Sequence, residues 1–301
     1  MIKKILIIKG PLQSIGRNIL LDNFENNIVD FKCNDYVEFY IKNYRSIFSK
    51  IILCTWSNQK QFVKELDPLT LKGINSIKYL DDDVNDKIKR KLNFQTKSSD
   101  YFLLNNSDRA MRLLGYSLEN LNVNPDDYIF VVRPDMKIDF SETLESSFLK
   151  NIKSNKIGIP CFTRSHAVHD FFFVFKYVDA LNFFDAQNNR ISTTNNPHTD
   201  YPINYLYKKT SNKLIKKLYR SISKDYLGRA FLLEIVSFNF VPTSKNLLSK
   251  VSWRGRNVNF EEIPNYFNFK KNSFLNFSYN SLKILIKFLL LKLKNLFKTN
   301  Q

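Results

Sequence analysis

The stretch Tyr128-Ile-Phe-Val-Val-Arg-Pro-Asp135-Met-Lys-Ile-Asp139 is the most informative segment of this 301-residue chain. Its first five residues are all apolar or aromatic, and such a run predicts a strand that is buried on both faces. Arg133 and Pro134 follow directly, and residues of this kind do not continue a buried central strand. Because open α/β sheets bind ligands at the carboxyl ends of their strands, we expect Arg133, Asp135 and Asp139 at a ligand-binding edge. The alternative is a strand that ends in an ordinary solvated acidic turn.

The segments on either side alternate between strand and helix patterns. In the first half we predict strands at residues 5–8, 50–56 and 74–80, and helices at 35–48 and 98–119. In the second half we predict strands at residues 156–162, 170–176 and 234–241, and helices at 177–187 and 198–209. This alternation predicts an α/β fold with a mostly parallel open sheet flanked by helices. The simplest division is a catalytic domain over residues 1–265 and a basic C-terminal tail over residues 266–301.

Composition excludes several classes of protein. Hydrophobic residues make up 44% of the chain and aromatic residues 15%, which indicates a folded protein and not a disordered one. Neither GxGxxG nor GxxxxGK[ST] occurs, so a glycine-rich dinucleotide fold and a P-loop NTPase are not expected. The three cysteines lie far apart with no CxxC pair, which argues against a disulfide scaffold and favours a reducing, cytoplasmic setting.

The net charge of +18 is concentrated in two segments. Residues 208–229 hold eight Lys and Arg against a single acid, Asp225, and residues 263–301 hold seven lysines and no acid. Each segment therefore carries a net charge of +7. Such clusters suit a protein that binds the phosphates of nucleic acid or one that lies on an anionic membrane.

The tail contains an amphipathic helical pattern at residues 281–298. At ~100° per residue, four of its lysines fall on one side and most of its leucines on the other. Its longest uncharged run is four residues, residues 288–291, against the roughly 20 that span a bilayer. We expect this helix to lie in an anionic membrane surface, which places the protein peripherally on the inner face of the cytoplasmic membrane. The alternative is a helix that packs on the catalytic domain or on a second subunit.

Candidate chemical groups cluster in two further regions. Asp170 directly precedes the apolar run 171–175, and His198 lies two residues before Asp200. His and Asp side chains suit general-base chemistry. The alternative is that these residues are neighbours in ordinary polar loops. Asn105 and Arg109 lie four residues apart on the predicted helix 98–119 and therefore share one face. Arg suits diphosphate binding, and a solvated helix face is the alternative.

In order along residues 5–210, these pieces resemble the WavE-type lipopolysaccharide-synthesis family, whose members are described as GT-A-like glycosyltransferases. The matching pieces are Ile8-Lys-Gly10-Pro11-Leu12 after the first strand, Ile51-Ile-Leu-Cys-Thr-Trp56, Asn105-Asn-Ser-Asp-Arg109, Val131-Val-Arg133-Pro-Asp135, and Asp170 followed by aromatics. The chain departs from the family at Asp81-Asp-Asp83, where Asp-Pro-Gly is usual, and at Pro134.

The resemblance implies a GT-A-like fold and the transfer of a sugar from a nucleotide-sugar donor to a lipooligosaccharide or capsular glycan acceptor. The charge on the leaving phosphate would be neutralised by a divalent cation, Mn²⁺ or Mg²⁺, or by Arg and Lys. The first candidate for the base that deprotonates the acceptor hydroxyl is Asp170, and the second is Asp200 together with His198. The candidates for metal binding are Asp135 and Asp139. The donor-binding candidates are Gly10, Pro11, Trp56, Asn105, Arg109, Arg133 and Asp135.

Two other classes stay open at the level of sequence. A basic nucleic-acid-binding protein would need aromatic residues among its cations, and Tyr207, Tyr219 and Tyr226 are placed that way. The second open class is a non-catalytic scaffold protein with the same fold.

Overall fold

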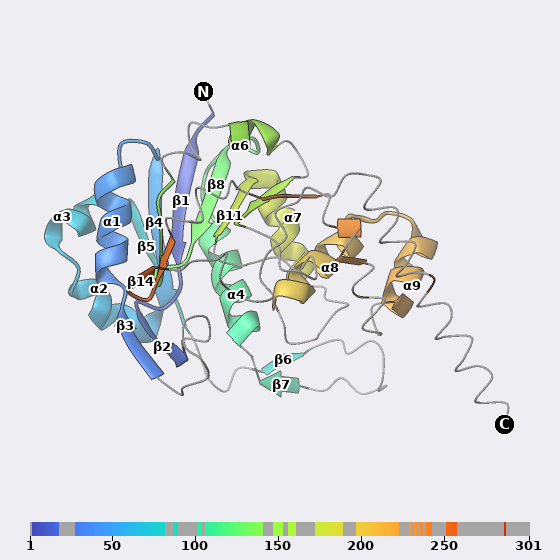
Figure 1. The fold of residues 1–301 in the computed structure, drawn as a ribbon, viewed down its shortest axis with the longest axis horizontal. Helices are drawn as coiled ribbons and strands as arrows, with labels where there is room; N and C mark the ends of the chain where they lie inside the picture. Colours follow the sequence, from blue (N-terminus) through green and yellow to red (C-terminus); the bar gives the residue numbers. More distant parts are fainter. Residues whose placement is uncertain are drawn as a thin grey trace.

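A seven-stranded sheet in the order β12-β10-β11-β8-β1-β4-β5 forms the centre of the computed structural model of this protein (Figure 1). The structure describes residues 2–17, 28–81, 87–89, 101–103, 106–140, 147–152, 156–160, 172–188, 197–222, 229, 232, 233, 235, 236, 239–242, 251–257 and 286. The strands are β1 (Lys4–Lys9), β4 (Lys50–Trp56), β5 (Ser76–Leu80), β8 (Tyr128–Val132), β10 (Ile157–Ile159), β11 (Phe172–Lys176) and β12 (Phe240–Pro242).

Strands β8, β1, β4 and β5 run parallel to one another, and β11 runs antiparallel to both of its neighbours, β8 and β10. The pairs β1–β8 and β1–β4 form the middle of the sheet. Four consecutive residues of β1, Ile5 to Ile8, have no exposed surface. Both faces of these apolar strands are covered, as a parallel sheet requires.

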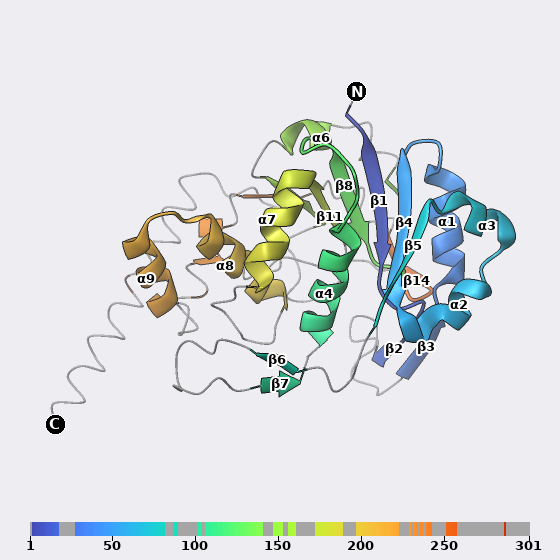
Figure 2. The same cartoon turned by 180° about the vertical axis from the view of Figure 1, so that it is seen from behind.

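Two helical layers provide that cover, and Figures 1 and 2 show them from opposite sides. The layer that shares a core cluster with Leu6, Ile8 and Phe130 contains α1 (Asn34–Tyr44), α2 (Lys60–Lys64), α3 (Pro68–Gly73) and α6 (Ser147–Asn151). The layer that shares a core cluster with Ile5, Ile7 and Val131 contains α4 (Asn106–Leu118), α7 (Tyr177–Asn188) and α8 (Pro197–Lys209). Helix α9 (Lys213–Ile222) follows α8 and lies at the opposite end of the long axis of the molecule from α3.

The order of the strands reverses beside β1. The chain passes from β1 to β4 and β5 on one side, and then crosses through α4 to β8 on the other side. In an open α/β sheet this reversal creates a crevice at the carboxyl ends of the two strands concerned, here β1 and β8.

Smaller sheets surround this edge. Strands β14 (Arg256–Asn257), β13 (Val251–Trp253) and β9 (Met136–Ile138) form an antiparallel sheet, so a segment from near residue 250 joins the residues that follow β8. Two hairpins also occur, one of β2 (Gln13–Arg17) with β3 (Ile28–Lys32) and one of β6 (Lys87–Lys89) with β7 (Tyr101–Leu103).

The α/β class and the mostly parallel sheet flanked by helices are confirmed. The strands at 50–56 and 128–132 have the predicted bounds, and the helices predicted at 177–187 and 198–209 are α7 and α8. The C-terminal tail falls outside the described residues except for Ile286, so the division at residue 265 stays a prediction. In the described part of the chain, no helix combines the length and the apolar character needed to cross a membrane.

Two predicted elements are wrong. The helix predicted at 98–119 begins at Asn106, because Tyr101–Leu103 pairs with Lys87–Lys89 as a strand, a conformation that aromatic residues favour. The strand predicted at 234–241 begins only at Phe240. The described residues before it are helical: Leu232, Leu233, Ile235 and Val236. Buried Val236 lies three residues after Leu233 and four after Leu232, and this spacing places the three side chains on one buried face of a helix.

Candidate functional site

The loops that follow β1 and β8 meet at Gly10 and Pro134. Gly10 has a φ of 147°, and a Cβ atom at this position would lie 2.8 Å from Cδ of Pro134 and 3.2 Å from its Cγ. The Gly10 N–H also donates to the carbonyl oxygen of Cys54, at the end of β4, over 3.1 Å. Gly10 is one of the donor-binding candidates expected from the sequence, and in the structure its missing side chain leaves room for Pro134.

The residues after Gly10 are held by side chains from elsewhere in the same layer. Gln59, which follows β4, accepts hydrogen bonds through Oε1 from the N–H groups of Leu12 (3.1 Å) and Gln13 (3.0 Å). The Cys33 N–H donates to the Leu12 carbonyl over 2.7 Å. These bonds tie the loop after β1 to the residues that follow β4 and to the start of α1, so the position of this loop is fixed.

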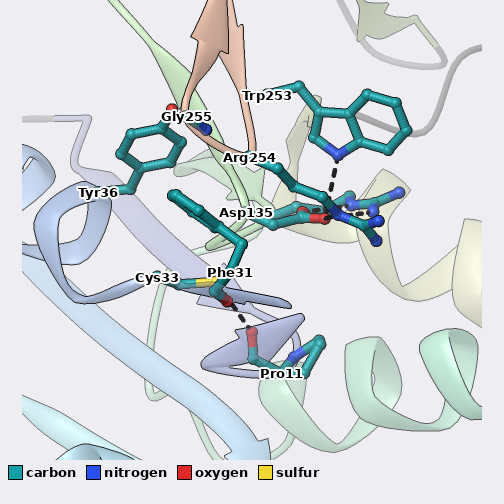
Figure 3. A network of polar contacts seen from close by, with 9 residues as sticks. Pro11, Phe31, Cys33, Tyr36, Asp135, Trp253, Arg254 and Gly255 are labelled. Atoms are coloured by element: carbon teal, nitrogen blue, oxygen red, sulfur yellow. Dashed lines mark hydrogen bonds and ion pairs between the residues drawn. The ribbon is translucent and has the colours of Figure 1, made fainter. Parts of the chain in front are cut away.

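Asp135 is the centre of the site, and its residue surface is 1% exposed. Arg133 donates two parallel hydrogen bonds to its carboxylate, from Nε to Oδ1 over 2.9 Å and from Nη2 to Oδ2 over 2.8 Å. Trp253 donates from Nε1 to Oδ2 over 3.1 Å, and Arg254 donates from Nε to the same oxygen over 3.2 Å. Figure 3 shows the side chains of Trp253 and Arg254 directed at Asp135 from the β13–β14 hairpin.

The hairpin turn itself is built to present Arg254. The pair Trp253–Arg256 closes a two-residue loop of Arg254 (φ 47°) and Gly255 (φ 82°), and positive φ at both positions is the pattern of a type I′ turn. Arginine is an uncommon residue in this conformation, which costs a non-glycine residue about 1 kcal/mol. Two backbone bonds compensate: the Arg254 N–H donates to the Asp135 carbonyl (3.0 Å), and the Gly255 N–H donates to the Tyr36 hydroxyl (2.8 Å).

The electrostatics of this cluster favour an anion nearby. Burial on its own would raise the pKa of the Asp135 carboxyl, but the charge and hydrogen bonds of Arg133, together with Arg254 and Trp253, outweigh it and hold the pKa at about 2. One carboxylate thus faces two guanidinium groups, and the three side chains together carry one positive charge. The buried Nη1 of Arg254 has no hydrogen-bond partner among the residues that the structure describes. A buried donor without a partner costs about 1–3 kcal/mol, which an incoming acceptor would recover.

Three tyrosines of α1, spaced four residues apart, hold the chain that continues from Asp135. The Tyr40 hydroxyl donates to the Met136 carbonyl (2.8 Å) and accepts from the Ile138 N–H (3.1 Å). The Tyr44 hydroxyl donates to Oδ1 of Asp139 (2.7 Å) and accepts from the Phe140 N–H (2.7 Å). Tyr36 completes the row through Gly255. One face of α1 therefore fixes both strands that carry the site, β9 and the β13–β14 hairpin.

These contacts bear on the metal pair expected at Asp135 and Asp139. Both oxygens of Asp135 accept hydrogen bonds from cations of the chain, and Asp139 accepts from Tyr44. A divalent cation at Asp135 would have to displace Arg133 or Arg254 against their positive charge. Over the described residues, no group of three His, Cys, Asp or Glu side chains is placed to hold a metal ion. The side chains of this cluster do not fit a metal ion, and metal dependence itself stays a prediction.

The other donor candidates lie at the same edge or outside the description. Pro11 follows Gly10, its carbonyl 3.5 Å from the Cys33 thiol, and Trp56 ends β4, half-buried. Asn105 and Asp170 lie outside the described residues. Arg109 in α4, and His198 and Asp200 in α8, lie in described helices, but their side chains are outside the description. The structure thus brings Gly10, Arg133 and Asp135 together.

The cysteines near this edge are core residues and not nucleophiles. Cys33 is fully buried, its thiol 3.5 Å from the Pro11 carbonyl and 3.9 Å from that of Phe31, and burial raises its pKa (Figure 3). Burial likewise raises the pKa of Cys54 to about 12, and its thiol contacts the Leu113 carbonyl. Thiols with raised pKa values are protonated at neutral pH and therefore unreactive.

Trp253, Arg254 and Tyr36 are not among the site residues predicted from the sequence. The hairpin has a local signal, because Val251-Ser-Trp-Arg254-Gly255-Arg places an X-Gly pair between strand-forming residues. No sequence pattern near residues 251–257 indicates that this hairpin pairs with the residues after β8, which lie more than a hundred positions earlier in the chain. Tyr36, Tyr40 and Tyr44 lie within the predicted helix 35–48, but no sequence pattern shows that their hydroxyl groups bind the residues of the site.

Comparison with known proteins adds little to these observations. No protein-family model matches the chain, and none of the curated proteins matches it. Among solved structures, the crystal structure of 2-C-methyl-D-erythritol 4-phosphate cytidylyltransferase from Francisella tularensis is similar with a TM-score of 0.35 and 13% sequence identity, over 81% of this chain and 92% of that chain. A similarity at this level gives no ground for assigning an activity.

Proposed function

We propose that this protein is a glycosyltransferase that binds the phosphates of a nucleotide-sugar donor at Arg133 and Arg254. The observation that carries the proposal is the shared carboxylate: Asp135 holds two guanidinium groups just after β8, at the edge of the sheet where the strand order reverses between β1 and β8. Open α/β sheets bind their ligands at this kind of crevice.

The arrangement suits a diphosphate for a physical reason. Glycosyl transfer from a nucleotide sugar leaves a nucleoside phosphate, so negative charge develops on the leaving oxygen and must be stabilised. The planar fork of arginine matches phosphate oxygens and stays charged at every physiological pH. Asp135 is a positioning residue in this scheme, because it orients both guanidinium groups before the ligand arrives.

The two arginines divide this task by their exposure. The Arg133 side chain is 28% exposed and provides the accessible cation, whereas the Arg254 side chain is 10% exposed and carries the buried N–H group. An acceptor hydroxyl must also lose its proton if the transfer inverts the sugar. Asp170 is the first candidate for that base, with Asp200 and His198 as alternatives. The pairing of Phe172 with Val132 supports this choice, because the chain enters β11 beside the end of β8.

The acceptor is proposed to be a lipooligosaccharide or capsular glycan, as the sequence resemblance implies. A lipid-linked acceptor would place the protein on the inner face of the cytoplasmic membrane, where the basic tail at 266–301 meets anionic lipids. Because two guanidinium groups already supply positive charge, we expect phosphate binding to persist when Mn²⁺ and Mg²⁺ are removed by chelation.

Calorimetric titration with a panel of nucleoside diphosphates tests the phosphate site. Arg133→Gln and Arg254→Gln should each weaken binding of the preferred nucleotide about tenfold or more, which corresponds to the loss of one charge-assisted hydrogen bond. Arg45→Gln, at an exposed arginine just after α1, is the matched control and should bind as the unaltered protein does. If both site variants bind every nucleotide as tightly as the control, the phosphate site lies elsewhere.

A donor assay then tests the reaction. The preferred nucleotide, supplied as its nucleotide sugars, should release the free nucleotide when a glycan acceptor is present. Binding without any such release over a full panel of sugars would leave a nucleotide-binding scaffold and not a transferase.

A further inference from the structure

Helix α9, Lys213–Ile222, is strongly two-sided. At ~100° per residue, Lys213, Lys216, Lys217 and Arg220 fall within about 100° of one another, and the opposite arc holds Leu214, Ile215, Leu218, Tyr219 and Ile222. Asn212 caps the helix, because its Oδ1 accepts from the N–H groups of Leu214 (2.9 Å) and Ile215 (3.1 Å). The cap shows that α9 begins at a defined residue of the folded chain.

Helix α9 exposes apolar side chains to solvent, whereas a helix on the surface of a protein in water usually buries them. Two of its cations face the protein: Nζ of Lys216 lies 5.4 Å and Cζ of Arg220 lies 5.1 Å from the centre of the Tyr207 ring. Its leucines face outward, with Leu214 78% exposed and Leu218 54% exposed. Ile215, beside them, is 40% exposed. A surface helix normally buries its apolar arc, so this exposed face indicates an interaction surface.

We propose that the exposed face of α9, defined by Leu214, Ile215 and Leu218, inserts into an anionic lipid membrane. Charge complementarity selects this occupant. Residues 208–229 hold eight Lys and Arg against one Asp, and the exposed Lys213 and Lys217 lie on α9 beside Leu214 and Leu218. Leucines that enter the acyl boundary beneath lysines that reach the headgroups are the pattern of an interfacial helix.

The aromatic residues of the region argue for lipid over nucleic acid. Tyr207 and Tyr219 are partly buried against the core, and the Tyr207 ring is covered by Lys216 and Arg220. A surface for single-stranded nucleic acid presents free aromatic faces on which bases stack, whereas the Tyr207 ring is covered and Tyr219 packs partly against the core. Tyr226 lies outside the described residues. The exposed apolar groups here are aliphatic, and aliphatic side chains partition into acyl chains.

The position of α9 makes this contact independent of the phosphate site. The helix lies at the opposite end of the long axis from α3, and the proposed donor crevice is at the ends of β1 and β8 (Figure 2). Substitutions on α9 can therefore be examined with nucleotide binding as an internal standard.

Co-sedimentation of the full chain with vesicles tests the proposal, using phosphatidylcholine alone and phosphatidylcholine with phosphatidylglycerol. The double variant Leu214→Gln/Leu218→Gln should lower the partition coefficient onto the anionic vesicles about tenfold or more. Leu69→Gln, at a leucine of α3 that is 72% exposed, is the matched control and should leave partitioning unchanged. Lys213→Gln/Lys217→Gln should reduce the preference for anionic over neutral vesicles.

Three results would overturn the proposal. The first is equal partitioning of the leucine double variant and the Leu69→Gln control. The second is a wild-type chain that binds a single-stranded oligonucleotide but no anionic vesicle. The third is self-association in light scattering that the leucine substitutions abolish while vesicle binding persists, which would assign the face to a second copy of the chain. Nucleotide affinity, measured on the same samples, reports separately on the phosphate site.

Discussion

Arg254 and Asp135 lie 119 residues apart in the chain, yet Arg254 binds Asp135 twice. Its backbone N–H donates to the Asp135 carbonyl over 3.0 Å, and its Nε donates to the Asp135 carboxylate over 3.2 Å. The first bond fixes the hairpin and the second fixes the guanidinium. The same aspartate thus joins a distant hairpin to the end of β8 and orients the cation that the hairpin carries.

Asp135→Asn should destabilise the folded protein by about 3 kcal/mol, because it removes the charge that pairs with the mostly buried Arg254 and the partly exposed Arg133. Urea unfolding followed by circular dichroism measures the change in the free energy of unfolding. We expect the fold to be affected because the carboxylate is buried and accepts hydrogen bonds from Arg133, Trp253 and Arg254.

Asp35→Asn, at an exposed acid in the first turn of α1, is the control and should change stability by less than about 0.5 kcal/mol. Equal stability of the two variants would show that Asp135 does not hold the cluster together.

Acid should unfold the protein through the same carboxylate. The pKa of Asp135 is lowered from 3.8 to about 2 by folding, so the unfolded chain binds the proton more tightly than the folded one. The stabilisation is therefore complete above pH 3.8 and is lost as the pH falls towards 2. Its size is about 2 kcal/mol. Unfolding free energies measured across this range should fall more steeply for the wild-type protein than for Asp135→Asn. Parallel pH profiles for the two proteins would contradict the assignment.

Gly10→Ala should cost about 2 kcal/mol of stability, because the new Cβ would lie 2.8 Å from Pro134 at a backbone φ of 147°. The double variant Gly10→Ala/Pro134→Ala removes the steric part and keeps the backbone part. Its loss of stability should therefore be smaller than the sum of the two single losses, as a double-mutant cycle measures. Additive losses would mean that the two loops do not depend on each other.

The sequence identified one strand of the site and missed its partner for a physical reason. The run from Tyr128 to Val132 is apolar enough to be recognised as a buried strand, and the charges after it stand at the end of that strand. The placement of Arg254 depends instead on pairing between β9 and β13, a contact between positions more than a hundred residues apart. Register over such a separation is set by packing of the whole chain and leaves no local pattern.

The same limit explains the metal prediction. Asp135 and Asp139 stand four residues apart after a strand, a spacing compatible with a shared metal. In the structure β9 lies between them, and each carboxylate has a separate partner: Arg133 for Asp135 and the Tyr44 hydroxyl for Asp139. Arg133 is close to Asp135 along the chain, but the sequence does not show that the two pair, and the second cation, Arg254, and the tyrosine come from the tertiary fold.

Asp170→Asn tests the acceptor side of the proposed reaction. The amide keeps the size of the carboxyl group and removes its basicity, so the turnover rate should fall at least about a hundredfold while donor affinity changes little. Steady-state rates and calorimetric donor binding on the same preparation separate the two effects. A variant that loses donor affinity and keeps its rate would move Asp170 to the donor side, and an unchanged rate would direct attention to Asp200 and His198.

Deletion of residues 271–301 separates the basic tail from α9 as membrane contacts. The deleted segment carries six lysines, no acid and a leucine-rich helical pattern, so its removal should weaken sedimentation with anionic vesicles, most strongly at low salt where charge attraction is least screened. Because α9 keeps its exposed leucines, some binding should remain at high salt, where apolar insertion dominates. The truncated chain carrying Leu214→Gln/Leu218→Gln should then lose that remainder. A truncated chain that binds as well as the full chain would show that the tail is not the membrane anchor. Nucleotide affinity should be equal in the full and the truncated chain, which controls for loss of the fold.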